Sequence, residues 1–379
     1  MKEEKKDVKG KGEKAKVQNP RKSLEGFGDE IVGEIKARKA PKFDTLARTK
    51  SNVTFDEKKG FLTVGKNTEE RSFINIAQSK RFMQTVAIAN KCHKFIVENL
   101  HTSIRGLFYQ LKYSLGEDVD ENIFSEQSES NPLIEDLEAS LGIRREDLNL
   151  NATRKGVLVG NLRVMDTFGG EKIEIDASKM GRSGWAIPSD VDNEIEFVGV
   201  KAKYVLVVEK DAIWQRLNED GFWKKENCIL LTPGGQATRG TRRMIRKFAD
   251  MGLPVYVFND GDAWGWYIYW TIKTGSINLA YIGGDIATPE ARFIGVTMSD
   301  LEKYEFLKKM TLKASDVDLK RAQEMLNYPW INRHREWVGE LKLVLKLKQK
   351  LEQDTLQGPR LTFVGDYIRE KIKNKDFLP

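Results

Sequence analysis

The chain has 379 residues, enough for about two or three domains that each bury a core of their own. No apolar run approaches the roughly 18 residues of a membrane-spanning helix, and no apolar stretch follows the charged amino terminus as it would in a signal peptide. Two cysteines and three histidines leave few ligands for a zinc site. This composition argues against a membrane protein and favours a reducing intracellular compartment.

The net charge of +7 is unevenly distributed along the chain. Residues 1–22 carry nine Lys/Arg and four Asp/Glu without apolar periodicity, so residues 1–23 are predicted to be a disordered basic tail. Residues 71–115 contain seven basic residues and one acid, Glu98. Such patches steer polyanions, although a solvated helix face is an equally good interpretation of each one. A second basic cluster consists of Arg239, Arg242, Arg243, Arg246 and Lys247.

Residues 24–115 begin with strands and continue as helices. Residues 52–64 have the pattern of a hairpin with a polar turn. Residues 72–115 have helical periodicity, and Thr102 or Ser103 is a plausible N-cap for a second helix. One apolar stripe of the first helix comprises Phe82, Val86, Ala89, Ile96 and Leu100.

The next segment alternates between polar loop and short elements. Residues 116–132 are acidic and Ser-rich and end in Asn-Pro, which predicts a surface loop. A short helix is expected over residues 133–141, and strand-like runs occur within 148–177. Small helices followed by strands suggest a winged helix-turn-helix.

From about residue 200 the pattern alternates between strands and helices, which indicates a parallel α/β sheet. The last hundred residues read as mostly helical and amphipathic. The expected strands span 203–208, 228–231, 254–259 and 277–282, and the expected helices span 211–217, 240–251 and a stretch from 263.

Three carboxylates follow two of these strands. Glu209 ends the run 204–208, and Asp260 and Asp262 end the run 255–259. The carboxyl ends of parallel strands line the ligand crevice, so the three side chains should meet there. Clustered carboxylates repel one another, and all-oxygen ligands suit Mg²⁺, which often binds through one or two carboxylates plus substrate phosphates. For the triad alone, a surface turn after each strand is an equally good interpretation.

Residues 102–115 form a second candidate site. An apolar stripe defines the core face of a helix, and Tyr109 lies roughly 140° from its centre, so it should face outward between Arg105 and Lys112. A phenol between two cations is a candidate nucleophile toward phosphate, although an exposed Tyr on a basic helix is more often a plain surface residue. Tyr113, one turn further on, competes geometrically. The stripe consists of Ile104, Leu107, Phe108, Leu111 and Leu115.

Taken in order, these motifs resemble the A subunit of type IIB DNA topoisomerases, topoisomerase VI, an archaeal relative of the meiotic double-strand-break protein. The resemblance covers roughly residues 70–379. The family places an Arg and an acidic residue shortly before the catalytic Tyr, and here Gly106 replaces the acidic residue. The matching stretches are residues 105–109, 152–162, 186–189, 208–211, 241–243, 259–262, 288–295 and 299–301.

The resemblance implies a chemistry. Tyr109 would attack a DNA phosphodiester and form a 5′-phosphotyrosyl link, with Arg105 clamping the phosphate oxygens. Mg²⁺ on Glu209, Asp260 and Asp262, the acidic motifs of a Toprim domain, would neutralise developing charge. We expect DNA contacts from Lys112, Arg239, Arg242 and Arg243.

The resemblance also implies an architecture and partners. A winged-helix domain over 71–160 and a Toprim domain over 161–379 would follow an extension, residues 24–70. A homodimer would cut both strands of double-stranded DNA, because the tyrosine and the metal site acting on one strand come from different protomers. No phosphate-binding loop of the Gly-x-x-x-x-Gly-Lys-Ser/Thr type occurs, so ATP hydrolysis should reside in a B subunit of an A2B2 heterotetramer. By elimination, residues 24–70 are the expected B-binding region, and the expected location is the cytoplasm, with the nucleoid.

Two other functions are compatible with parts of the pattern. A Toprim nuclease or primase would use metal with water or a nucleotide, and Tyr109 would be incidental. A non-catalytic winged-helix protein would bind DNA without Mg²⁺ and never cleave it. Covalent attachment of protein to DNA separates the topoisomerase from both.

Overall fold

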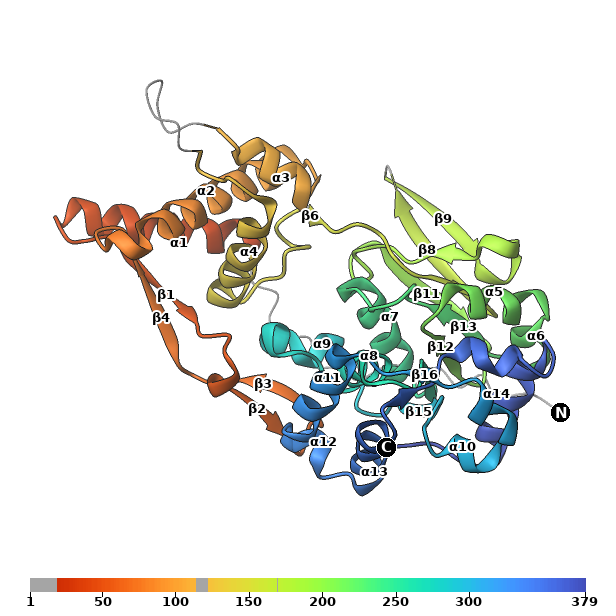
Figure 1. Cartoon of the computed structure of the whole chain (residues 1–379). Helices are drawn as coiled ribbons and strands as arrows, with labels where there is room; N and C mark the ends of the chain where they lie inside the picture. Colours follow the sequence, from red (N-terminus) through yellow and green to blue (C-terminus); the bar gives the residue numbers. More distant parts are fainter. Residues whose placement is uncertain (1–18, 114–121, 169) are drawn as a thin grey trace.

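A computed structural model describes residues 19–113, 122–168 and 170–379 (Figure 1). Two hydrophobic cores divide it into an N-terminal lobe, built around helices α1–α4, and a sheet lobe, built around the six-stranded sheet. Within the described ranges no helix is both long and apolar enough to cross a membrane. The predicted tail lies outside these ranges up to residue 18. Residues 20–23 were wrongly assigned to it, because α1 (Pro20–Lys36) begins at Pro20 with Asn19 as its N-cap.

The N-terminal lobe packs four helices. They are α1, α2 (Ile76–Glu98), α3 (Ile104–Leu111) and α4 (Gln127–Leu141). Ser103 caps α3, as predicted, because its hydroxyl accepts the Gly106 N–H. The predicted stripe of α2 is wrong at Leu100, which is 53% exposed because the helix ends at the left-handed C-cap Asn99. The surface loop predicted over 116–132 lies outside the described residues at 116–121. It is wrong at Ile123 and Phe124, which are buried, and from residue 127, where α4 begins despite Pro132 in its second turn.

The segment before α2 joins the two lobes. Its outer strands β1 (Lys42–Leu46) and β4 (Thr68–Ser72) pair antiparallel beside the N-terminal lobe. Its tip is the predicted hairpin, β2 (Val53–Asp56) with β3 (Phe61–Val64). The hairpin residues Val53 and Leu62 are buried in the core of the sheet lobe (Figure 1). The extension therefore ties one lobe to the other.

Short strands follow the N-terminal lobe. β5 (Thr102–Ser103) pairs parallel with β6 (Leu150–Asn151). Strands β8 (Leu162–Phe168), β9 (Glu171–Asp176) and β11 (Ile195–Val200) form an antiparallel sheet of their own in the order β11-β8-β9. The sequence analysis assigned residues 161–379 to one Toprim domain. Strands β8, β9 and β11 lie within that range but form a sheet separate from the six-stranded one.

The six-stranded sheet has the order β10-β7-β13-β12-β14-β15. The strands β12 (Val205–Val208), β13 (Ile229–Thr232), β14 (Val255–Phe258) and β15 (Arg292–Gly295) run parallel, as predicted for the first three. Strands β7 (Val157–Val159) and β10 (Trp185–Ala186) complete it antiparallel. Residues 157–159, assigned to the winged-helix domain, therefore belong to this sheet. The crossover helices include α5 (Asp211–Glu219), α7 (Arg239–Asp250) and α8 (Ala263–Thr274).

The strand predicted over 277–282 is wrong. Residues Ile277–Ile282 form a 3-10 segment, η4, that packs against β3. A short apolar run bounded by Ser and Gly fits a buried helical turn as well as a strand. The carboxyl-terminal region is mostly helical, as predicted, with one two-stranded pair, β16 (Leu312–Lys313) and β17 (Gln349–Lys350). The other helices are α6 (Phe222–Glu226), α9 (Gly283–Ile286), α10 (Asp300–Lys303), α11 (Asp316–Leu326), α12 (Pro329–Asn332), α13 (Arg335–Leu347) and α14 (Phe363–Lys373).

Candidate functional site

The structure brings the three predicted carboxylates to one edge of the sheet. β12 and β14 are adjacent parallel strands, so Glu209 and the segment 260–262 leave the sheet side by side. The Asp260 N–H donates to Glu209 Oε2 at 3.2 Å, and the Glu209 N–H donates to the Phe258 carbonyl at 3.0 Å. Asp262 caps α8 by accepting the Gly265 N–H at 2.7 Å. Backbone geometry thus holds the cluster together although its charges repel.

Burial and mutual repulsion change the acidity of the cluster. Burial, and then the neighbouring Asp260, raise the pKa of Glu209 to about 7. Burial raises the pKa of Asp260 to about 6, against the lowering effect of the Gln353 N–H, and burial also raises the pKa of Asp262. The ionised carboxylates therefore cost folding free energy. That cost is full above about pH 7 and is relieved as the pH falls toward the ordinary carboxyl pKa.

Two lysines, which the sequence analysis did not single out, neutralise part of this charge. Lys210 Nζ lies 3.2 Å from Asp260 Oδ2 and also pairs with Glu352 and Asp354. Lys350 Nζ lies 3.7 Å from Asp262 Oδ2. Among the residues that the structure describes, no three His, Cys, Asp or Glu side chains are already arranged to hold a metal ion. The carboxylate cluster is thus partly neutralised by two lysine ammonium groups and is not already arranged as a metal-binding site.

The tyrosine helix presents its phenol to solvent, as predicted. The Tyr109 side chain is 58% exposed, whereas Leu107, Phe108 and Leu111 are buried. Arg105 Nη2 donates to Tyr109 Oη at 3.4 Å, and its guanidinium lies 5.8 Å from the centre of the ring. This hydrogen bond and the charge of Arg105 lower the pKa of Tyr109, which favours the nucleophilic phenolate.

Lys112 and Tyr113 are the other two residues predicted near the Tyr109 phenol. Lys112 contributes a weaker electrostatic lowering of the Tyr109 pKa, and its Nζ lies 5.8 Å from the centre of the Phe108 ring. Tyr113 is 51% exposed, so exposure alone does not separate the two tyrosines. The Arg105 hydrogen bond does separate them, because its acceptor is Tyr109.

The phenol and the carboxylates lie in different lobes of one chain. Tyr109 is on α3 in the N-terminal lobe, and its ring contacts Phe108 and Arg105 of its own helix. The carboxylates end strands β12 and β14 in the sheet lobe, which Figure 1 shows apart from α3. The two candidate sites, the tyrosine helix and the carboxylate cluster, are therefore separate within one chain.

Comparison with known proteins assigns both halves to one family. Family models match residues 204–372 (the Toprim domain of the topoisomerase 6 A subunit and Spo11), 80–150 (type IIB DNA topoisomerase) and 155–201 (the all-beta domain in the DNA topoisomerase VI alpha subunit). The A subunit of type 2 DNA topoisomerase 6 from Pyrococcus abyssi is 42% identical over 370 residues, covering 94% of this chain and 95% of that protein. The chain belongs to the family of topoisomerase 6 A subunits.

Further relatives extend the likeness across domains of life. The A subunit of the Aeropyrum pernix enzyme is 40% identical over 365 residues, covering 92% of each protein. The A subunit of DNA topoisomerase 6 from Arabidopsis thaliana is 30% identical over 351 residues, covering 92% of this chain and 79% of that protein. The sheet lobe therefore contains a Toprim domain of the topoisomerase 6 family, as the sequence motifs predicted.

Gly106, where the resemblance implies an acidic residue, is closely surrounded by the side chains of Thr102 and Ser103. A Cβ at this position would lie 2.3 Å from the Thr102 hydroxyl and 3.2 Å from the Ser103 hydroxyl that caps the helix. A side chain at this position would require the Thr102 hydroxyl to move. Glycine avoids this contact at the start of α3.

The second basic cluster corrects a prediction of DNA contacts. Arg239 and Arg242 are buried, so they cannot form an open DNA-binding face. Arg239 Nη1 donates to both carboxylate oxygens of Glu138 at 2.7 and 2.9 Å. Burial lowers the pKa of Arg242 to about 10. Arg243 is half-buried and donates to Asp192 at 2.8 Å. Arg239 and Arg243 therefore form ion pairs with distant carboxylates, and Arg242 is buried, which the run of charges in the sequence does not show.

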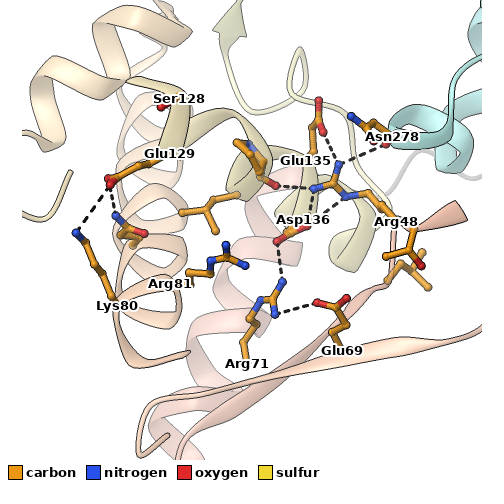
Figure 2. A pocket seen from close by; sticks show the side chains of 15 residues that line it. Arg48, Glu69, Arg71, Lys80, Arg81, Ser128, Glu129, Glu135, Asp136 and Asn278 are labelled. Carbon is orange, nitrogen blue, oxygen red and sulfur yellow. Dashed lines mark hydrogen bonds and ion pairs between the residues drawn. The ribbon is translucent and has the colours of Figure 1, made fainter. Parts of the chain in front are cut away.

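Arg239 belongs to a polar interface between the two lobes of the protein. Glu138 of α4 also accepts from the Tyr281 hydroxyl of η4 at 2.8 Å. Arg48 shares Glu135 with Arg239, donates to Asp136 at 2.7 Å and reaches the Asn278 carbonyl (Figure 2). A cavity of about 530 Å³ opens beside these pairs. Salt bridges of α4 thus fasten the tyrosine-bearing lobe to the Toprim domain.

Replacing Glu138 with Gln tests this interface. The change keeps the shape but removes the charge that compensates buried Arg239, so the free energy of unfolding should fall by about 3 kcal/mol or more. Glu70→Gln is the matched control, because the Lys42–Glu70 pair is exposed and screened by solvent and should contribute far less than the buried pair. Urea unfolding of each variant measures the difference. An equal loss of unfolding free energy in the two variants would contradict a stabilising role for the buried Arg239–Glu138 pair.

Proposed function

We propose that Tyr109 is the nucleophile of this DNA-cleaving subunit and that Arg105 is its activating partner. As a member of the family of topoisomerase 6 A subunits, the chain is the DNA cleavage subunit of a type IIB topoisomerase. The observation that carries the residue assignment is the hydrogen bond from Arg105 to the exposed phenol of Tyr109, at the position of the family's catalytic tyrosine.

The proposed reaction is a transesterification. Tyr109 Oη forms a bond to a DNA phosphorus, the bond from phosphorus to the 3′ oxygen breaks, and a proton leaves the phenol as the 3′ hydroxyl takes one up. The phosphotyrosyl ester keeps the energy of the broken bond, so religation is the reverse attack by the 3′ hydroxyl. Arg105, which already contacts the phenol, would stabilise the charge on the non-bridging oxygens, and exposed Lys112 would contact the neighbouring backbone.

We further propose that Glu209, Asp260 and Asp262 hold Mg²⁺. The donor set is all oxygen, and burial together with mutual repulsion raises the pKa of Glu209 and Asp260, so the ionised cluster is costly without a cation. Such a cluster suits an ion that takes only one or two carboxylates and completes its shell with phosphate and water. The bound ion would supply neutralisation of charge that develops on the reacting phosphate.

The family resemblance implies a homodimer that acts in trans. Tyr109 and the carboxylates lie in different lobes of one chain, and we propose that the phenol of one protomer meets the carboxylates of its partner on one DNA strand. Two such composite sites would cut both strands. We propose that residues 71–160 include a winged-helix domain that delivers Tyr109 to double-stranded DNA, and that the protein acts in the cytoplasm, on the nucleoid.

A second proposal concerns an A2B2 assembly with the ATPase B subunit. The β2–β3 hairpin within residues 24–70 is buried against the sheet lobe, so α1 is the remaining candidate surface of the predicted region. We extend it to residues 73–76, at the start of the neighbouring helix α2. Apolar side chains are exposed there beside a hollow of about 420 Å³ between α1 and α2. We name this the α1–α2 apolar surface: Val32, Ile35, Phe73, Ile74 and Ile76.

A charge on this surface should prevent assembly. Ile35→Asp should leave the fold of this chain intact and weaken its binding to the B subunit by at least about tenfold, since an exposed apolar anchor is replaced by a charge. Val317→Asp on α11 is the control, because Val317 is 61% exposed and lies in the sheet lobe. Analytical ultracentrifugation of each variant mixed with the B subunit measures both. Normal binding by Ile35→Asp would exclude this surface.

Removing one hydroxyl tests the nucleophile. Tyr109→Phe should fold and bind DNA normally, but it should form no protein-linked breaks with the B subunit, ATP, Mg²⁺ and supercoiled DNA after a detergent stop. Tyr113→Phe is the matched control and should retain cleavage. Wild-type cleavage by Tyr109→Phe would contradict the assignment and favour a metal-dependent nuclease.

Replacing an aspartate with its amide tests the metal site. Asp260→Asn and Asp262→Asn keep the shape and remove one negative charge, so each should lower Mg²⁺-dependent cleavage by at least about a hundredfold, since the lost stabilisation amounts to several kcal/mol. Above about pH 7 without Mg²⁺, the melting temperature should stay equal or rise, because a repulsion is relieved. Paired cleavage and melting measurements check this. Normal cleavage by both variants, or by wild type in chelator, would refute the site.

A further inference from the structure

A segment near the carboxyl terminus closes over the ends of β12 and β14. Gly261 and Leu351 pair antiparallel, with the Gly261 N–H donating to the Leu351 carbonyl at 2.8 Å and the Leu351 N–H donating back at 3.1 Å. The approach is close, because a Cβ on Gly261 would lie 3.2 Å from the Leu351 Cβ and 3.0 Å from the Val296 carbonyl oxygen. Residues far apart in the sequence therefore share one wall of the carboxylate site.

Gln353 is the residue of this segment that meets the site most directly. It is fully buried. Its Nε2 donates to the Phe258 carbonyl at 2.6 Å, and its Oε1 accepts the Lys210 N–H at 3.2 Å. Its own backbone N–H donates to Asp260 Oδ1 at 2.7 Å. One amide side chain thus bridges the end of β14 to the residue that follows Glu209.

We propose that Gln353 is a positioning residue for the carboxylate cluster, one that fixes Glu209 relative to Asp260 so that both can serve one divalent cation. The inference rests on the metal site of the proposed function. The Phe258 carbonyl accepts from both the Glu209 N–H and Gln353 Nε2, so the amide orients the peptide that also holds Glu209. Partners that orient metal ligands commonly change metal affinity by about 10- to 100-fold when they are removed.

The geometry separates this role from simple packing. Gln353→Met nearly preserves volume, so the core beneath should stay filled. The substitution removes both side-chain hydrogen bonds and leaves the backbone N–H to Asp260 in place. The ends of β12 and β14 would then lose the bridging hydrogen bonds of the Gln353 amide, while each carboxylate would keep its charge. A weaker cation site is the expected result, in a folded protein whose melting temperature is lower because the Lys210 N–H loses its acceptor.

The test measures cation binding directly, with the full-length protein and Mn²⁺ alone, by electron paramagnetic resonance. Gln353→Met should bind Mn²⁺ about tenfold more weakly than wild type. In cleavage assays with the B subunit, ATP and DNA, it should need about tenfold more Mg²⁺ for half-maximal cleavage and should approach the wild-type maximum at saturating Mg²⁺. Gln357→Met, in the same 3-10 turn Gln353–Gln357, is the matched control and should behave as wild type in both assays.

Each outcome decides between the alternatives. Wild-type Mn²⁺ affinity in Gln353→Met, with only a lower melting temperature, would overturn the proposal and leave the metal site standing. Absence of Mn²⁺ binding in the wild type would overturn both. If Gln353→Met fails to fold, Gln353→Asn makes the same comparison, because its amide is one methylene too short to reach Phe258 and Lys210 together. Loss of Mn²⁺ affinity in the folded variant supports the positioning role.

Discussion

Repulsion among buried carboxylates at one edge of the sheet is the constraint around which the rest of the site is built. Glu209 and Asp260 follow adjacent parallel strands, so their proximity is imposed by the fold and cannot be relieved by moving apart. Hydrogen bonds from backbone N–H groups and the ammonium groups of Lys210 and Lys350 offset part of the cost. A site that is under-compensated in this way is ready to accept a cation together with the phosphates of a substrate.

Within one chain the proposed nucleophile lies in the other lobe from these carboxylates. On α3 the phenol of Tyr109 has a guanidinium beside it, which favours the phenolate. Splitting the chemistry between lobes also makes the relative placement of the lobes part of the mechanism. Two devices hold that placement: the hairpin β2–β3, whose apolar residues enter the core of the sheet lobe, and the buried pairs of α4 with Arg239.

Arginines in basic runs of the sequence have two different roles here, one at an exposed candidate site and one in a buried ion pair. Arg105 is exposed and faces the Tyr109 phenol, while Arg239, in an equally basic run, is buried against Glu138. Desolvation decides between them, because a buried guanidinium needs a carboxylate partner and an exposed one remains available to phosphate. The partner of Arg239 lies far earlier in the chain, in a stretch that reads as acidic loop and short helix.

The sequence by itself determined the local features whose causes are local. Apolar strands that stop at carboxylates, the helical stripe that turns Tyr109 outward and the Ser103 cap each follow from residues within one or two turns of each other, and the structure has all three. The order of motifs also identified the family. Only the tertiary structure decided the contacts between distant segments: the burial of Arg239 and Arg242, the hairpin in the far lobe, the 3-10 turn at Ile277–Ile282, and Gln353 beside Asp260. Those features depend on which surfaces pack together, and a buried ion pair or a bridging amide leaves no periodicity in the chain from which it could be predicted.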